Sequence, residues 1–260
     1  MKFKDHFSSR AGDYAEFRPV YPQALFKFLA NTAKSHNLAW DCATGSGQAA
    51  RGLVEYFDRV IATDMSAEQL RHAEPHPQIT YRVAAAENSN IPSRSVDLIT
   101  VAQALHWLSF ESFFQEVCRV LKSGGLIAVW CYGPMQVNAA VDLIVRHYYI
   151  NIVGSFWPPE RRYIDEKYQT VPFPFVELPA PEFIMRAEWN MNELIGYLRT
   201  WSATQRYQDK NTQDPLDLIR GKLAEAWSPA EQRLTIQWPI YLRLGTVTPL
   251  PGKQARKINA

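Results

Sequence analysis

Apolar and polar residues in the first half of the chain recur at two alternating spacings, one helical and one typical of buried strands. Leu25, Phe26 and Leu29 fall at helical spacing and predict a helix over 21–36. Short apolar runs that end at a glycine loop or at an acid predict buried strands. Further helices are expected over 48–57, from Ser66 to near Pro75 and over 110–121, and strands over 38–42, 59–63, 79–84, 96–102 and 126–130.

This alternation predicts the fold class. Strands separated by helices form βαβ units, which build a mostly parallel sheet with helices on both faces. The chain is therefore expected to be an α/β protein with a Rossmann-like sheet and right-handed crossovers. Ligands of such sheets lie beyond the carboxyl ends of the strands, so the loops after Cys42, Asp64, Ala84 and Ala102 should share one edge.

The second half follows a different pattern. Six prolines between Pro158 and Pro181 interrupt helical periodicity and predict a segment that wanders over the surface. Helices are expected over 137–153, 191–201 and 215–227, and a terminal strand pair over 233–238 and 240–247. We expect residues 1–132 to form the core with an N-terminal lid, and residues 133–260 to form a mainly helical cap that completes the sheet and covers the substrate.

Composition narrows the classes of function. Lys and Arg number 28 against 26 for Asp and Glu, and this near balance argues against a general binder of nucleic acid or acidic membranes. Three cysteines without a CxxC pair predict neither a disulfide framework nor a thiolate zinc site. His72 and His76 have metal-ligand spacing, but Pro75 and Pro77 disrupt the helix that such a site needs, so no metal is expected. The sequence has no apolar signal core and no membrane-length apolar run, which predicts a cytoplasmic protein.

The loop from Asp41 to Gly47 carries the first candidate chemistry. Its glycines permit positive φ angles and a close approach of the backbone to a ligand, beside the free N–H groups of the next helix. Asp64 ends the following strand, where an acid can accept the hydroxyls of a ribose. The loop also satisfies GxGxxA, a dinucleotide-binding pattern, but Asp41 would repel a pyrophosphate. S-adenosylmethionine has a ribose, an ammonium group that Asp41 would attract, and no phosphate.

Several ordered motifs from about residue 7 to residue 132 together resemble the class I S-adenosylmethionine-dependent methyltransferases. They are the DxxxGxG loop at 41–47, Asp64 followed by Met65, Ala86-Glu87 shortly before Ile91-Pro92, and the segments 96–104 and 116–125. Three further elements resemble the trans-aconitate methyltransferase-like (methyltransferase type 11) group. These are an N-terminal YxxxRPxYP element with Tyr14 and Arg18, QALHW at 103–107, and YLRTWSA at 197–203.

The resemblance implies a set of cofactor contacts. Asp41 would bind or orient the methionine ammonium group, with a loop-capping role as the alternative, while Asp64 and Met65 would lie at the ribose. The remaining contacts would be Ala43, Gly45 and Gly47 along the cofactor, Ala86 and Glu87 at the adenine, Gln103 beside the methyl donor, and Tyr14 and Arg18 at the methionine carboxylate or an acidic substrate. The family usually has glycine where this chain has Ala43, and the methyl group should narrow the approach to the methionine moiety.

Four residues are candidates for the acceptor pocket. His106 and Trp107 follow the expected tip of the fourth strand, where His106 is a candidate base or a structural hydrogen-bonding group and Trp107 a pocket wall. Tyr197 and Trp201 lie four residues apart on an expected helix of the cap. They would add to the pocket, although helix packing explains the same spacing.

These observations predict a methyltransferase that uses S-adenosylmethionine and releases S-adenosylhomocysteine, with a small-molecule acceptor that the group resemblance suggests is a carboxylic acid. A nicotinamide-linked oxidoreductase that uses the same loop is one alternative, and a binding protein of the same fold without turnover is another. A nucleic-acid methyltransferase is less expected, because the NPPY-type tetrapeptide is absent and Ala102-Gln103-Ala104-Leu105 stands in its place.

Overall fold

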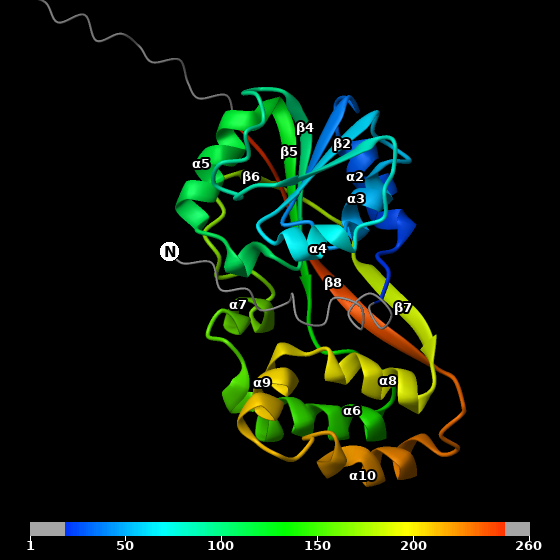
Figure 1. Ribbon diagram of the computed structural model, residues 1–260. Helices are drawn as coiled ribbons and strands as arrows, with labels where there is room; N and C mark the ends of the chain where they lie inside the picture. The colour runs from blue at the N-terminus through cyan, green and yellow to red at the C-terminus, as the bar shows by residue number, and fades with distance from the viewer. Residues whose placement is uncertain (1–18, 248–260) are drawn as a thin grey trace, which may run out of the picture.

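A single twisted sheet organises residues 19–247, which the computed structural model describes (Figure 1). The strands lie in the order β3-β2-β1-β4-β5-β8-β6, and β7 also pairs with β8. Neighbouring strands among β1 to β5 are parallel, whereas β8 is antiparallel to β5, β6 and β7. The strands are β1 Leu38–Cys42, β2 Arg59–Asp64, β3 Ile79–Val83, β4 Val96–Ala102, β5 Leu121–Tyr132, β6 Val176–Leu178, β7 Phe183–Trp189 and β8 Leu234–Thr246. The predicted α/β class and mostly parallel sheet are confirmed.

Helices cover both faces of the parallel part of the sheet. All five residues of β1 are buried, as expected for a strand enclosed on both sides. On one face Leu29 and Leu53 pack into a core with Trp130, and on the other Val117 packs with Trp40. The helices concerned are α2 (Gln23–Thr32) and α3 (Gln48–Leu53) on the first face and α5 (Phe110–Val120) on the second, with the short α4 (Ala67–Arg71) after β2. Ser66 caps α4 as expected, by accepting the N–H of Gln69.

The strand order reverses at β1, which pairs with β2 on one side and with β4 on the other. The first half of the chain extends the sheet outward from this switch point in both directions. The carboxyl ends of β1, β2 and β4 therefore bring the glycine loop, Asp64 and Gln103 to one edge, as the sequence predicts.

The cap lies beyond this edge and is mostly helical (Figure 1). Its elements are α6 (Ala139–His147) with the π-helical turn η3 (Tyr148–Ile152), the 3-10 turn η4 (Gly154–Phe156), α7 (Arg161–Asp165), α8 (Met191–Arg199), α9 (Ser202–Lys210) and α10 (Asp217–Trp227). The three helices expected in this half are confirmed as α6 with η3, α8 and α10. Helix α9 was not expected, because its sequence is mostly polar and buries only Ala203 and Thr204.

The C-terminal strand pair is present, but its strands differ from the two expected. Residues 234–246 form one continuous strand, β8, and its partner in the cap is β7, which lies upstream of α8. Pro239 does not break β8, because it lies where the pairing of β8 changes from β5 to β7. Ile240 is the residue at which this change occurs, since it pairs with Tyr132 of β5 and also with Phe183 of β7. The expected break at Pro239 is therefore wrong.

Candidate functional site

The loop between β1 and α3 adopts backbone angles suited to glycine. Ala43, Gly45 and Gly47 all have positive φ, at 53°, 57° and 85°. A Cβ atom on Gly47 would lie 2.5 Å from the hydroxyl oxygen of Tyr81, so a side chain at this position would also require Tyr81 to move. The sequence prediction of a tight glycine turn at the edge of the sheet is confirmed.

Asp41 is the internal anchor of this loop. Its carboxylate is fully buried and accepts hydrogen bonds from the Thr44 hydroxyl, from the Ala50 N–H at 3.0 Å and from the Thr100 hydroxyl at 2.7 Å. Burial outweighs these bonds and raises the pKa of Asp41 to about 6. The structure thus gives Asp41 a loop-capping role, and its contact with a ligand ammonium group stays a prediction.

Asp64 connects the ends of two strands. One carboxylate oxygen accepts the N–H of Gly45 and the other accepts the N–H of Ser66, both at 2.8 Å. Met65 beside it is exposed. The acid lies at the strand end where a ribose is expected, and ribose binding stays a prediction.

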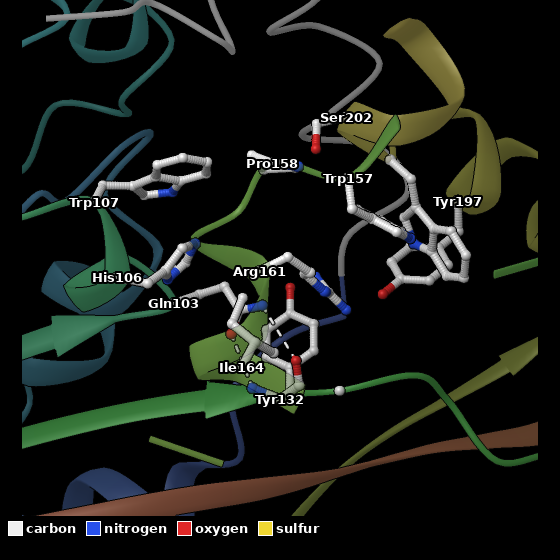
Figure 2. A pocket seen from close by; sticks show the side chains of 12 residues that line it. Gln103, His106, Trp107, Tyr132, Trp157, Pro158, Arg161, Ile164, Tyr197 and Ser202 are labelled. Carbon is white, nitrogen blue, oxygen red and sulfur yellow. Dashed lines mark hydrogen bonds between the residues drawn. The ribbon is translucent and has the colours of Figure 1, made fainter. Parts of the chain in front are cut away.

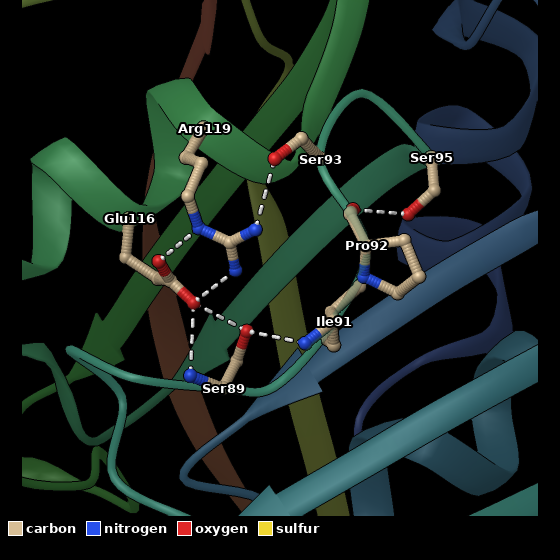
Figure 3. Close-up of polar contacts among 7 residues, drawn as sticks. All are labelled: Ser89, Ile91, Pro92, Ser93, Ser95, Glu116 and Arg119. Atoms are coloured by element: carbon tan, nitrogen blue, oxygen red, sulfur yellow. Dashed lines mark hydrogen bonds and ion pairs between the residues drawn. The ribbon is translucent and has the colours of Figure 1, made fainter.

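The segment after β3 carries the two residues predicted at the adenine. Ala86 is buried, and Glu87 accepts the N–H of Ser109 at 3.0 Å, next to the start of α5. Figure 3 shows a second tie, in which Glu116 of α5 accepts the Ser89 N–H at 2.8 Å and the Ser89 hydroxyl at 2.5 Å. Two acids therefore hold this segment against α5.

The chemistry of these groups discriminates between candidate cofactors. The pKa of the Cys42 thiol is raised first by burial and then by the charges of Asp41, Glu87 and Asp64, so these three carboxylates converge on one region. A pyrophosphate would meet repulsion there, whereas a cofactor that carries positive charge on sulfur and nitrogen would be attracted. The residues present thus fit S-adenosylmethionine and argue against a dinucleotide.

Gln103 marks the tip of β4. It has a positive φ of 55°, and its amide pairs with the Tyr132 backbone by accepting the N–H at 2.8 Å and donating to the carbonyl at 3.2 Å. This pairing fixes the ends of β4 and β5 beside the glycine loop, the position expected for a residue near the methyl donor.

A pocket opens between this strand tip and the cap, and Figure 2 shows its walls. It brings together the residues that the sequence singled out, since Gln103, His106, Trp107, Tyr197 and Trp201 all line it. Tyr197 and Trp201 also contact each other edge to face, with ring centroids 5.9 Å apart. Tyr14 and Arg18 lie outside the described residues.

The proline-rich segment contributes two walls that sequence reasoning missed. Trp157 and Arg161 line the pocket, and the guanidinium carbon of Arg161 lies 4.5 Å from the centroid of Trp157. Arg161 also donates from Nε to the hydroxyl of Tyr149 at 2.7 Å. The expectation of a wandering surface segment is corrected here, because Pro158 and Pro159 directly precede the short helix α7. An arginine just after a Trp-Pro-Pro sequence was the available signal.

His106 is held at the back of this pocket, on the 3-10 turn η2 (Leu105–Trp107). Its Nδ1 lies 2.9 Å from the Tyr168 hydroxyl, and the side chain is 6% exposed. Burial, and to a lesser extent the charge of Arg161, lower its pKa to about 3. A group with this pKa accepts a proton poorly at neutral pH, so the geometry favours a hydrogen-bonding role over the base role.

Two further expectations concern metal ions and membranes. Within residues 19–247, no group of His, Cys, Asp and Glu side chains is arranged to hold a metal ion. The same part of the chain contains no helix of the length and apolar character that crossing a membrane requires.

Comparison with known proteins identifies the family. Residues 40–129 match the family model described as a methyltransferase domain. A chain from Dictyostelium discoideum described as a methyltransferase is 34% identical over 94% of this chain and 95% of its own length. A probable S-adenosylmethionine-dependent methyltransferase of Saccharomyces cerevisiae is 35% identical over 89% of this chain and 93% of its own length.

Solved structures agree. A chain from Anaeromyxobacter dehalogenans described as a type II methyltransferase superposes with a TM-score of 0.84 at 42% identity, over 90% of this chain and 99% of that chain. The similarity thus extends over the core and the cap together. With the carboxylate-lined glycine loop and the strand order already described, these matches show that the chain belongs to the class I S-adenosylmethionine-dependent methyltransferases.

Proposed function

We propose that the chain methylates a carboxylate oxygen of a small molecule bound between the sheet edge and the cap. The observation that carries this proposal is Arg161, a cation in a pocket that several aromatic rings line and which reaches Gln103 at the tip of β4. A guanidinium in such a setting favours an anionic acceptor, because its planar donors match a carboxylate.

The cofactor supplies a methyl group on a positively charged sulfur, which an acceptor oxygen displaces in line while the electrons of the broken C–S bond stay on sulfur. In this proposal residues 1–132 hold the cofactor and residues 133–260 select the acceptor. Asp64 would accept the ribose hydroxyls, the segment with Ala86 and Glu87 would face the adenine, and Asp41 would hold the loop that receives the methionine end. Tyr14 and Arg18 stay predicted contacts of the methionine carboxylate or of an acidic substrate.

The chain's own task is alignment and exclusion of water. A carboxylic acid is ionised at neutral pH, so its oxygen already has the lone pair that forms the new O–C bond, and no proton has to be removed. The rings of Trp107, Trp157, Tyr197 and Trp201 would enclose the acceptor at the cofactor, which favours a reaction that disperses charge.

The first test is isothermal titration with S-adenosylmethionine, S-adenosylhomocysteine and NADH. We expect micromolar binding of the first two and none of NADH, with a loss of at least tenfold in affinity for Asp64→Ala and an unchanged fold by circular dichroism. Unchanged affinity in that variant would refute the ribose assignment. Tighter binding of NADH would favour the oxidoreductase alternative.

The second test is a panel of mono-, di- and tricarboxylic acids with matched amides and amines, read out as release of S-adenosylhomocysteine. Turnover confined to acids supports the proposal. Turnover confined to amines contradicts it, and cofactor binding without turnover on a broad panel favours the binding-only alternative.

A further inference from the structure

Tyr168 lies behind the pocket, where the chain leaves α7 (Arg161–Asp165). Lys167 and Tyr168 both adopt left-handed backbone angles, with φ of 56° and 59°, and the Tyr168 carbonyl accepts a hydrogen bond from Arg243 Nη1 at 2.8 Å. Its side chain is fully buried. This turn fixes the phenol against His106.

The hydrogen bonds of the Tyr168 hydroxyl define the direction of its proton. The backbone N–H groups of Leu105 and His106, at the start of η2, lie on the side of this oxygen and partly offset the rise in its pKa that burial causes. A phenol has one proton to give, and burial raises the pKa of Tyr168 so that it keeps this proton at neutral pH. The remaining partner, 2.9 Å away, is His106 Nδ1, so Tyr168 donates to that nitrogen.

The tautomer of His106 follows. A neutral imidazole whose Nδ1 accepts a hydrogen bond carries its proton on Nε2. His106 lines the pocket, and no group in residues 19–247 accepts a hydrogen bond from Nε2. The lone pair on Nδ1 faces Tyr168, so the imidazole can offer a bound molecule only the N–H of Nε2.

Arg161 offers donors in the same pocket. Its contacts with the Tyr149 hydroxyl at 2.7 Å and with Asp165 at 3.7 Å both use Nε. The two terminal nitrogens have no hydrogen-bond partner in the described part of the chain. Trp157 stacks on the guanidinium and keeps it at the pocket wall.

We propose that His106 presents a fixed Nε2–H to the acceptor, and that this N–H and the terminal nitrogens of Arg161 together bind one carboxylate. The body of the acceptor is an apolar ring enclosed by the tryptophans. This inference rests on the proposed function and names the substrate class of that site as aromatic monocarboxylic acids. It assigns Tyr168 the task of holding the tautomer.

The tautomer can be measured without any substrate. Nitrogen NMR of the full chain labelled in histidine, from pH 6 to pH 8, should show His106 neutral throughout, with Nε2 bearing the proton. The His106 signals are assigned from a His106→Gln sample. Tyr168→Phe removes the donated proton and should shift the ring toward the other tautomer or into protonation. A ring protonated on Nδ1 in the native protein would overturn the assignment, whatever the activity.

Binding of the acid is tested with benzoate and benzamide, which have the same ring and differ in charge. With S-adenosylhomocysteine present, benzoate should bind at least tenfold more tightly than benzamide, and Arg161→Met should abolish this preference. The exposed neighbour Arg162→Met is the matched control and should keep it. Equal binding of the two probes to the native protein would contradict the carboxylate site while leaving cofactor binding intact.

Substitution of His106 separates a donor from a base. In turnover of benzoate, His106→Gln can still donate from its amide and should retain activity within about threefold. His106→Phe should lose about 10- to 100-fold, the range for a hydrogen bond to a charged group. His147 is exposed, so His147→Gln is the control for loss of a histidine outside the pocket. A base role predicts instead that the Gln and Phe variants are equally inactive and that native activity falls steeply below neutral pH.

Discussion

The methyl group of Ala43 introduces backbone strain into the loop between β1 and α3. Ala43 has a φ of 53°, a conformation that costs an L-residue with a Cβ atom about 1 kcal/mol or more. Gly45 and Gly47 adopt their positive φ angles without such a cost, because glycine has no Cβ atom. The loop therefore folds with strain at the one position where a side chain replaces the glycine usual in this family.

Ala43→Gly should relieve this strain. We expect the free energy of unfolding to rise by roughly 0.5–1 kcal/mol, because relief of the strained angle exceeds the added freedom of the unfolded chain. Affinity for S-adenosylmethionine should rise a few-fold as the approach to the methionine end widens. Urea unfolding and calorimetry measure the two effects, and a loss of stability would show that the left-handed angle is not strained.

Asp41 should make stability depend on pH. Its pKa in the folded state is raised to about 6 from an ordinary value of 3.8, so ionisation of the buried group opposes folding. That cost is fully present above pH 6 and disappears as the pH falls from 6 toward 4. Asp41→Asn should therefore gain stability relative to the native protein between pH 5 and pH 8, by up to about 3 kcal/mol.

Unfolding of both proteins in urea at several pH values measures this difference. A constant gap across the range would mean that Asp41 is charged at little cost in the fold. The Asn variant should at the same time bind S-adenosylmethionine more weakly, because the negative charge that attracts the cofactor is lost.

Much of the site can be predicted at the scale of single residues, and the exceptions have physical causes. Asp41, Asp64 and Gln103 lie at or directly after strand ends, and His106 and Trp107 follow shortly after β4, so the apolar runs of the strands reveal their positions. Arg161 could not be located in this way, because α7 is too short, directly after two prolines, to give a periodic pattern of apolar residues in the sequence. The position of Tyr168 depends on two consecutive left-handed residues that are not glycine, which no propensity predicts.

At the scale of elements, α5 is the support for the segment that follows β3. Burial alone would raise the pKa of Glu116, but hydrogen bonds from Arg119 and Ser89 outweigh burial and lower it to about 2. At neutral pH Glu116 is therefore ionised, and its carboxylate accepts the hydrogen bonds that hold Ser89 near Glu87. Helix α5 in this way links the segment after β3, where the adenine contacts are predicted, to the turn that carries His106.

Glu116→Gln should loosen this link. We expect a loss of about 1–3 kcal/mol in stability at pH 7, the cost of replacing a charged hydrogen-bond acceptor, and a several-fold weaker binding of S-adenosylmethionine. The loss should shrink as the pH falls from about 4.5 toward 2, where the native carboxylate itself becomes protonated. Glu111→Gln, an exposed change on the same helix, is the control and should alter neither quantity.

The parallel core shows how far pattern alone can predict elements. β4 begins and ends at the predicted residues, because an apolar run in a strand enclosed on both faces has sharp limits. The order of β6, β7 and β8 could not be deduced, because β6 and β7 alternate only weakly between apolar and polar residues and therefore resemble loops. β7 alternates between buried and partly exposed residues and lies beside the cap, where helices were expected.

At the scale of the whole molecule, β8 joins the two halves. Residues from 240 onward pair with β5 of the core, and residues up to 240 pair with β7 of the cap. Trp238 of the same strand is fully buried against Trp189 and Tyr197 of the cap, at centroid distances of 5.1 and 5.5 Å. The cap and the core therefore share one element and one hydrophobic cluster.

This sharing predicts that the chain unfolds as one unit. Tryptophan fluorescence, which reports largely on the cap, and far-ultraviolet circular dichroism, which reports on the whole chain, should give the same midpoint in urea. Saturation with S-adenosylhomocysteine should raise both midpoints together, because ligand binding stabilises the native state as a whole. Two separate transitions would show that the cap folds independently of the sheet.

Methylation of a carboxylate oxygen can be tested by following the methyl group itself. The protein is incubated with S-adenosylmethionine labelled with deuterium in its methyl group and with benzoate, and the product is examined by mass spectrometry before and after treatment with alkali. We expect a labelled methyl ester, from which alkali releases labelled methanol and benzoate. Label on carbon or nitrogen of a product that survives alkali would contradict the carboxylate acceptor, and so would the absence of labelled ester from a protein that binds both molecules.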